Sequence, residues 1–355
     1  MTSVKPAVTA GGKPAPSLMV REAAEAPEVA KRLLTANAAA CRELGARLRA
    51  APPRFAVTCA RGSSDSAATY AKYLIELRLG VVVASVGPSV SSVYRAKVGM
   101  KDALFLAISQ SGRSPDLLAL AEAARADGAL TVAIVNDASS PLAAICEVVL
   151  PLHAGPEKSV AATKSYLASL TAVLQLVAEW SADPALIAAT GRLPHTLVAA
   201  LTNDWRKALG PLTTARNLYV AGRGVGYAAA QEIALKFKET CGLHAEAISA
   251  AELMHGPLAL AGPEFPVLVL GQDDEALASL REMAAGLAGR DVPVFAAGPG
   301  AGWAGTTLPI VKDLHPFLQP IASVQSFYPL ADAVAHARGH DPDHPPYLRK
   351  VTETR

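Results

Sequence analysis

Cysteine is scarce in this sequence, and none of it is arranged for metal binding. The 355 residues contain four cysteines, without a CxxC pair and without a histidine cluster at zinc spacing: Cys41, Cys59, Cys146 and Cys241. We therefore expect no metal site. Isolated cysteines are typical of reduced thiols, so we also expect an intracellular protein.

Long apolar runs and concentrations of one charge are missing as well. The most apolar segment, residues 166–178, has about 13 residues, whereas a helix that spans a bilayer needs about 20. The first residues, Met-Thr-Ser-Val-Lys, lack the apolar core of a secretory signal. The 33 Lys and Arg residues nearly balance the 31 Asp and Glu residues, and no basic run or aromatic-interleaved basic patch occurs. The sequence predicts a cytoplasmic protein with neither a membrane nor a nucleic-acid partner.

Apolar segments of strand length alternate with helical segments along most of the chain. Hydrophobic residues make up 51% of the composition, which is ample for a packed core. Continuous apolar strands that alternate with helices predict parallel sheets covered on both faces. We predict strands at residues 54–59, 81–86, 103–108, 130–135, 148–152, 217–221, 265–270 and 292–297.

The alternation pauses at residues 183–207, which have the pattern of a helical connector, and then restarts. Both halves begin with a strand, a glycine-containing turn and a helix, so we predict two α/β domains of the same type. The proposed boundaries are an N-terminal tail and helix (1–45), a first domain (46–195), a second domain (206–340) and a C-terminal tail (341–355).

Two serine-rich turns follow apolar strands in the first domain. In the second turn Ser114 is a favourable N-cap and Pro115 a favourable first helical residue. Free N–H groups at a helix N-terminus attract anions, and hydroxyl groups add uncharged donors. Ordinary capping would explain either turn alone, but the pair favours a phosphate site. Its candidate residues are Gly62, Ser63, Ser64, Ser109, Gln110, Ser111 and Ser114.

A third turn, Gly222-Arg-Gly-Val-Gly226, also follows a predicted strand. Its third glycine comes one residue too early for the G-x-G-x-x-G pattern of dinucleotide sites. We therefore interpret it as a tight turn rather than a cofactor site.

Acids, bases and amines gather beside apolar sequence in residues 232–255. Partial burial moves the pKa values of such groups toward neutrality, as proton-transfer chemistry requires. On a helix over residues 227–239, Lys236 is a helical neighbour of both Glu232 and Glu239. We predict that Glu232 and Lys238 form surface ion pairs and that Glu239 projects into a site. The histidines His244 and His255 are compatible with core packing or with catalysis.

Together these motifs resemble the double-SIS (sugar isomerase) family, and within it the isomerase half of glutamine–fructose-6-phosphate amidotransferases. The resemblance covers about residues 45–355 and implies two SIS domains, each a three-layer αβα sandwich of flavodoxin-like type. Its motifs are Gly62-Ser-Ser64, Ser109-Gln-Ser-Gly-Arg-Ser114, Val160-Ala-Ala-Thr-Lys164, Ala234-Leu-Lys-Phe-Lys-Glu239, His244-Ala-Glu246, Glu252-Leu-Met-His-Gly-Pro-Leu258 and Lys350.

The resemblance also implies roles for individual residues. Glu239 would move a proton between C1 and C2 of an open-chain sugar phosphate, with help from Lys236. His255 would open the sugar ring and reach a neighbouring site across a homodimer interface. Lys350 would form a Schiff base with the ketose or lie beside the reacting carbonyl. Such chemistry needs no metal or redox cofactor.

Two departures shape the functional expectation. The chain begins Met-Thr-Ser, without the glutaminase domain of the amidotransferases, and Ala162 replaces a ligand-contacting serine of the family. The adjoining residues Ala161 and Ala162 stay candidate substrate contacts. The segment 156–164 and the ending after Lys350 resemble stand-alone SIS-type glucosamine-6-phosphate deaminases. We therefore expect conversion of glucosamine 6-phosphate and water to fructose 6-phosphate and ammonia.

Three alternatives stay open. The chain could be an isomerase or deaminase for another amino-sugar phosphate, since one sequence does not reveal stereochemical preference. It could make glucosamine 6-phosphate with a separate glutaminase subunit. It could also be a non-catalytic sugar-phosphate sensor, although a sensor would need the serine turns without Glu239, His255 and Lys350.

Overall fold

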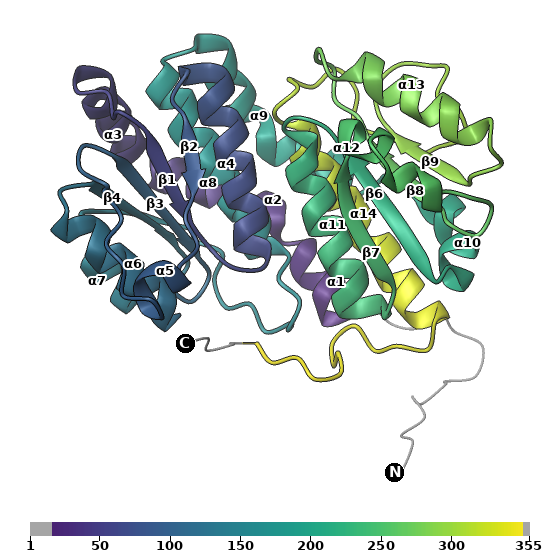
Figure 1. Ribbon diagram of the computed structural model, residues 1–355, viewed down its shortest axis with the longest axis horizontal. Coiled ribbons are helices and arrows are strands. Elements are labelled where there is room, and N and C mark those ends of the chain that lie inside the picture. The colour runs from purple at the N-terminus through teal and green to yellow at the C-terminus, as the bar shows by residue number, and fades with distance from the viewer. Residues whose placement is uncertain (1–15, 351–355) are drawn as a thin grey trace.

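Two α/β halves lie side by side in the structure (Figure 1). The computed structural model describes residues 16–350, so the last five residues of the predicted C-terminal tail lie outside the described part. Each half contains a five-stranded parallel sheet. This confirms the expected α/β class.

The two sheets have the same topology. The first has the order β2-β1-β3-β4-β5, formed by β1 (Ala56–Cys59), β2 (Val83–Ser85), β3 (Leu104–Ser109), β4 (Leu130–Val135) and β5 (Val148–Pro151). The second has the order β7-β6-β8-β9-β10, formed by β6 (Asn217–Gly222), β7 (His244–Ser249), β8 (Val267–Leu270), β9 (Val294–Ala297) and β10 (Thr306–Thr307). Equal strand order in equal chain order supports a duplication.

Helices cover both faces of each sheet. The first half contains α1 (Leu18–Ala23), α2 (Ala26–Ala36), α3 (Ala38–Ala50), α4 (Ser63–Leu79), α5 (Ser89–Ser92), α6 (Pro115–Ala126), α7 (Pro141–Ile145), α8 (Lys164–Ser181) and α9 (Pro184–Ala200). The second contains α10 (Leu209–Thr214), α11 (Gly226–Cys241), α12 (Ala250–Met254), α13 (Leu277–Ala288) and α14 (Gln319–Ala337), with 3-10 turns at Arg206–Ala208 and Pro257–Leu260.

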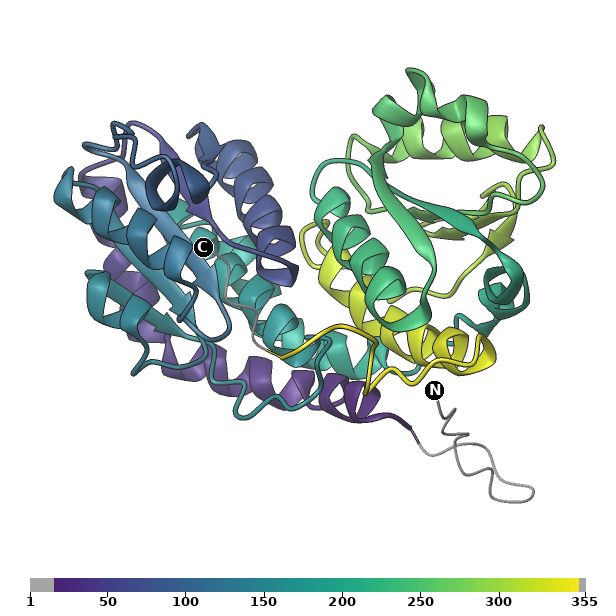
Figure 2. The same cartoon turned by 60° about the horizontal axis from the view of Figure 1, so that its bottom comes forward.

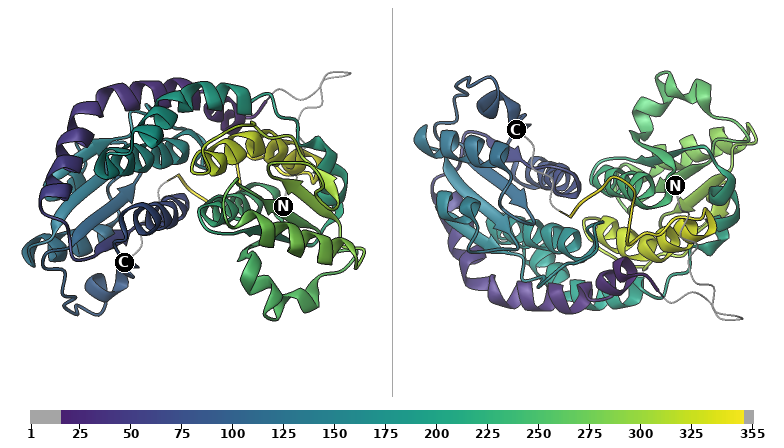
Figure 3. Two further views of the ribbon diagram at one scale, coloured as in Figure 1. Left: turned by 90° about the horizontal axis from the view of Figure 1, so that it is seen from above. Right: turned by 90° about the horizontal axis from the view of Figure 1, so that it is seen from below.

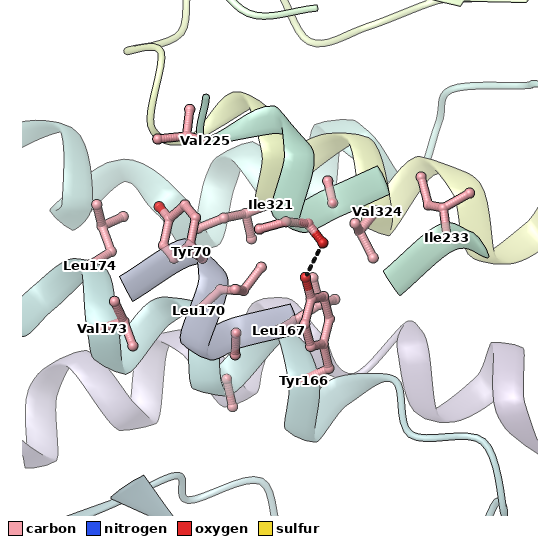
Figure 4. Packing of buried hydrophobic residues seen from close by; sticks show 14 of the residues in the cluster. Tyr70, Tyr166, Leu167, Leu170, Val173, Leu174, Val225, Ile233, Ile321 and Val324 are labelled. Carbon is pink, nitrogen blue, oxygen red and sulfur yellow. Dashed lines mark hydrogen bonds between the residues drawn. The ribbon is translucent and has the colours of Figure 1, made fainter. Parts of the chain in front are cut away.

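The two halves share one apolar core. The outer faces of the sheets pack against α6 and α7 and against α12 and α13. The inner faces pack against α4 and α8 and against α11 and α14, and these helices also pack on one another. Figure 4 shows the junction, where the hydroxyl of Tyr166 on α8 donates a 3.4 Å hydrogen bond to the carbonyl of Ala228 on α11. Seen from above and below, α4 and α11 lie side by side at the centre (Figure 3).

The structure departs from the expected elements in several places. In place of the single N-terminal helix expected within residues 1–45, the chain forms the three helices α1, α2 and α3. Neither β7, inside the titratable segment, nor α14 was predicted. No helix in the described range 16–350 is long and apolar enough to cross a membrane. The apolar run at 166–178 is instead the buried helix α8.

Candidate active site

A cavity of about 260 Å³ opens at the carboxyl ends of β1 and β3. It is lined by residues from the first sheet, from α11 and from the C-terminal tail, which crosses to the first half from the end of α14 (Figure 2). The lining residues are Arg61, Gly62, Ser63, Ser64, Ile108, Ser109, Gln110, Ser111, Ser114, Leu117, Val160, Ala162, Glu239, Leu348, Arg349 and Lys350.

Both serine-rich turns contribute a helix N-terminus to this cavity. Helix α4 begins at Ser63 and α6 begins directly after Ser114. Unpaired N–H groups and the helix dipole make such ends favourable for an anion. All seven predicted phosphate-site residues therefore line one cavity.

The second turn depends on a glycine. Gly112 has φ +62, and its N–H donates a 3.0 Å hydrogen bond to the hydroxyl of Ser109. A Cβ at this position would lie 2.2 Å from Oγ of Ser140. The turn therefore has room for glycine only, in a conformation that other residues rarely adopt.

Arg61, a cation in the cavity wall, was not among the predicted site residues. Arg61 directs Nε and Nη2 to Oδ2 of the buried Asp116, at 3.1 and 2.7 Å. This pair ties the first serine turn to the start of α6. The proximity of Arg61 to Gly62 in the sequence was the signal available, but its partner is 55 positions away.

Lys236 is fully buried behind the cavity and contacts residues of both halves. Its ammonium group donates to Oγ of Ser63 at 3.0 Å and to Oε2 of Glu239 at 2.5 Å. Burial alone would lower the pKa of Lys236, but the carboxylates of Glu232 and Glu239 outweigh it and raise the pKa. Lys236 is thus held as a cation beside Glu239.

Glu232 corrects a prediction. It is not a surface residue but is completely buried, with one carboxylate oxygen 3.4 Å from Nζ of Lys236. Burial raises the pKa of Glu232 to about 7, and the positive charge of Lys236 offsets part of the effect. The prediction was wrong because α11 packs on two sides, against α4 and α14. Lys238 is exposed, as expected.

Lys350, in the C-terminal tail, also lines the cavity. Nζ of Lys350 donates to Oε2 of Glu157 at 2.9 Å and to the carbonyl of Ser159 at 2.7 Å. Glu157 was missed as well. It lies in the string Gly-Pro-Glu-Lys-Ser-Val before α8, where its charge gave no sign that its side chain is fully buried.

The remaining candidates lie elsewhere. His255 is exposed at the end of α12 and is not part of the cavity lining. His244 is exposed at the start of β7, 3.0 Å from Oδ1 of Asn217. Ala161 is buried beside the lining residue Ala162 and does not itself line the cavity.

In the second sheet, the turn that corresponds to the first serine-rich turn is filled by the side chain of Gln272. The side-chain amide of Gln272 donates to the carbonyl of Arg223 at 2.8 Å and to both carboxylate oxygens of Asp274. A Cβ at Gly226 would lie 2.5 Å from Oε1 of Gln272. This confirms the tight-turn interpretation of residues 222–226. Within residues 16–350, no group of three or more His, Cys, Asp and Glu side chains is placed to hold a metal ion.

Proteins of known structure share this architecture. A Silicibacter pomeroyi DSS-3 protein described as a phosphosugar isomerase is 46% identical, with a TM-score of 0.88 over 92% of this chain and 100% of that one. The C-terminal domain of glucosamine-fructose-6-phosphate aminotransferase from Francisella tularensis is 25% identical, with a TM-score of 0.80 over 95% of this chain and 100% of that one.

Sequence comparison gives the same relationship. The glutamine–fructose-6-phosphate aminotransferase (isomerizing) of Zymomonas mobilis is 34% identical over 309 residues, which are 81% of this chain and 50% of that protein. The chain thus spans about half the length of the curated relatives it matches. The SIS domain model matches residues 53–179 and 211–296. With this match across both sheets, the chain belongs to the SIS domain family.

Proposed function

We propose that the chain is an amino-sugar-phosphate deaminase with aldose–ketose isomerase chemistry. The reaction is glucosamine 6-phosphate plus water to fructose 6-phosphate plus ammonia. One observation carries the proposal: Glu239 and Lys350 line the same small cavity as the two serine-rich turns. A carboxylate and an amine thus face the place where a sugar phosphate would be held.

The phosphate group would bind between the N-termini of α4 and α6. The hydroxyls of Ser64, Ser111 and Ser114 and the adjoining backbone N–H groups are donors of the right type. Arg61 adds a positive charge at the wall, although Asp116 takes up part of it. The sugar carbons would then extend from these turns toward Glu239.

Glu239 would act as the proton carrier. In the open-chain aldehyde its carboxylate removes the proton from C2, which gives an enolamine, and returns a proton to C1, which gives the fructosimine. Lys236, 2.5 Å away, orients the carboxylate. Water then adds to C2 of the fructosimine, ammonia leaves, and the C2 ketone of fructose 6-phosphate forms.

Lys350 would stand at the C2 carbonyl. Its amine, once deprotonated, can replace ammonia at C2 as a Schiff base that water hydrolyses, and its ammonium form can polarise the carbonyl oxygen. Either role requires the tail to be docked, because Lys350 reaches the cavity only through the tail.

His255 would open the sugar ring in a site shared between two subunits of a homodimer. Within one chain His255 lies outside the cavity, and its surroundings favour an interface. Met254 and Leu260, close to His255 in the sequence, are 53% and 64% exposed, and exposed apolar side chains that gather together mark interaction surfaces. A second copy that covers this apolar segment would bring His255 to its neighbour's cavity.

Synthesis of glucosamine 6-phosphate is the second candidate, since the curated relatives are named aminotransferases. Deamination and amination use the same proton transfer and the same imine, so the cavity supports either direction.

The direct test incubates the purified protein with glucosamine 6-phosphate and measures fructose 6-phosphate and ammonia. We expect both in equal amounts. Release from galactosamine 6-phosphate instead would keep the reaction class and overturn the substrate. Formation of glucosamine 6-phosphate from fructose 6-phosphate and ammonium, without measurable deamination, would favour the aminotransferase direction.

A further inference from the structure

Three segments that are far apart in the sequence meet beside Lys350. They are the C-terminal tail (residues 341–350), helix α1 and residues 157–165, here called the loop, which run from the connection after β5 into the first turn of α8. Figure 2 shows the tail passing close to α1 on its way to the first half. Hydrogen bonds to three carboxylates, those of Glu157, Glu22 and Asp343, connect the three segments in a closed circuit.

The first carboxylate, Glu157, has three hydrogen-bond donors that do not belong to the tail. Its side chain is completely buried and accepts hydrogen bonds from the N–H groups of Thr163 and Ser165, both at 3.0 Å, and from the Ser165 hydroxyl at 2.6 Å. Lys350 makes the fourth contact, at 2.9 Å. A carboxylate held by three loop donors gives the ammonium of Lys350 a partner of defined position.

Glu157 also stays ionised at the neutral pH at which the reaction would run. Burial alone would raise the pKa of Glu157, but the charge of Lys350 and the hydrogen bonds from Ser165 and Thr163 lower it overall. The attraction toward Lys350 is therefore present throughout the neutral pH range.

The second carboxylate, Glu22 on α1, fixes the other acceptor of Lys350. Its two oxygens accept the N–H groups of Lys158 at 2.6 Å and Ser159 at 3.1 Å. Ser159 is also the residue whose carbonyl accepts the 2.7 Å bond from Lys350. Helix α1 thereby sets the position of the peptide to which Lys350 is bound.

The third carboxylate, Asp343 in the tail, returns to α1. Its oxygens accept the N–H groups of Leu18 at 2.7 Å and Met19 at 3.0 Å, at the N-terminus of that helix. A negative charge at this end is favoured by the helix dipole and satisfies donors that have no partner inside the helix. The circuit runs from the tail to α1, from α1 to the loop and from the loop to Lys350.

We propose that Glu157 is the positioning residue for Lys350, and that Glu22 and Asp343 hold the tail and the loop in register through α1. Docking of the tail does not depend on which reaction the protein catalyses. Its consequence for turnover rests on the proposed function, in which Lys350 acts at C2 of the sugar.

The variants Glu157→Gln and Asp343→Asn test the circuit, with Glu25→Gln as the matched control. Glu25 forms a 2.7 Å ion pair with Lys164 close to α1 and has no hydrogen bond or ion pair with residues 341–350, the part of the tail that the structure describes. For Glu157→Gln we expect kcat to fall about 100-fold, since misplacement of a reacting group by about 1 Å costs that much. KM should change less than about threefold, because the phosphate turns are untouched. Asp343→Asn should lower kcat by a smaller factor, and Glu25→Gln should leave it unchanged.

A readout without substrate separates docking from function. Trypsin can cut after Lys350 only when the ammonium group of Lys350 leaves Glu157 and the carbonyl of Ser159, because this side chain must enter the specificity pocket of the protease. The rate of release of the C-terminal peptide, followed by mass spectrometry, should rise at least about tenfold in Glu157→Gln and Asp343→Asn and stay at the wild-type rate in Glu25→Gln.

These measurements distinguish a failure of the docking circuit from a failure of the proposed function. Faster release in both variants, from a protein that does not deaminate any hexosamine phosphate, would support the docking circuit and contradict the proposed function. Release at the wild-type rate in the folded Asp343→Asn and Glu157→Gln variants would overturn the circuit. Faster release with an unchanged kcat in Glu157→Gln would overturn the role of Glu157 in positioning Lys350 for turnover.

Discussion

The ammonium group of Lys236 in the second half donates a 3.0 Å hydrogen bond to the hydroxyl of Ser63 in the first half. Ser63 is the first residue of α4 and lies in the predicted phosphate turn, whereas Lys236 lies on α11 and also holds Glu239 at 2.5 Å. One buried cation therefore sets the distance between the phosphate turn of one half and the carboxylate of the other.

Replacing Lys236 should destabilise the whole chain. Lys236→Met leaves the buried Glu232 without its cation, and removal of one partner of a buried ion pair costs about 3–5 kcal/mol. Urea denaturation should show the loss in the free energy of unfolding. Lys238→Met is the matched control, because this exposed side chain is on the same helix and should change stability by less than about 0.5 kcal/mol. Equal midpoints for the two variants would contradict the account of the buried ion pair.

Glu232 should make stability fall with rising pH. Its pKa is about 7 in the folded chain against an ordinary value of 4.5. Between these two values the folded chain binds a proton that the unfolded chain has lost, so the free energy of unfolding decreases as pH rises. In Glu232→Gln this decrease should disappear. The free energy of unfolding of the variant, relative to that of the wild type, should therefore be higher above pH 7 than below pH 4.5, by at most about 3 kcal/mol. If the free energies of unfolding of the wild type and of Glu232→Gln change equally with pH across this range, the raised pKa of Glu232 is contradicted.

How much of this site the sequence reveals depends on the distance between partners. The serine turns were predictable because capping and strand-to-helix order are local, and Glu239 and Lys350 were found through a resemblance of motifs. Glu232 was misjudged because helical spacing does not distinguish a solvated face from one covered by a second helix. Glu157 was missed because its role depends on Lys350, which is 193 positions away.

The second serine turn should tolerate no side chain at Gly112. Gly112→Ala places a methyl group 2.2 Å from Oγ of Ser140 and forces the turn to open. We expect KM for the sugar phosphate to rise about tenfold as the donors for the phosphate separate, which corresponds to about 1.4 kcal/mol. Gly128→Ala controls for backbone strain, since Gly128 has φ +89 but nothing within 4 Å of the added Cβ. A rise of KM in both variants alike would point to general destabilisation instead.

A shared active site should show intersubunit complementation. Glu239→Gln and His255→Ala should each be inactive, but in a mixed dimer one of the two cavities has an intact Glu239 and receives an intact His255. After denaturation and refolding of an equal mixture, random pairing predicts about one quarter of wild-type activity. Each variant refolded alone is the control. A mixture no more active than its components, or a wild-type chain that sediments as a monomer, would place His255 outside the reaction.

The proton transfer assigned to Glu239 is tested most directly by NMR in D₂O. The protein is incubated with fructose 6-phosphate, ammonium and glucosamine 6-phosphate, and deuterium is followed at C1 of the ketose and C2 of the amino sugar. This readout does not depend on which direction the reaction runs. We expect the wild-type protein to incorporate deuterium at these carbons and Glu239→Gln to be slower by a factor of about 10²–10⁴. Wild-type exchange rates in folded Glu239→Gln would contradict the central claim that this carboxylate moves the proton.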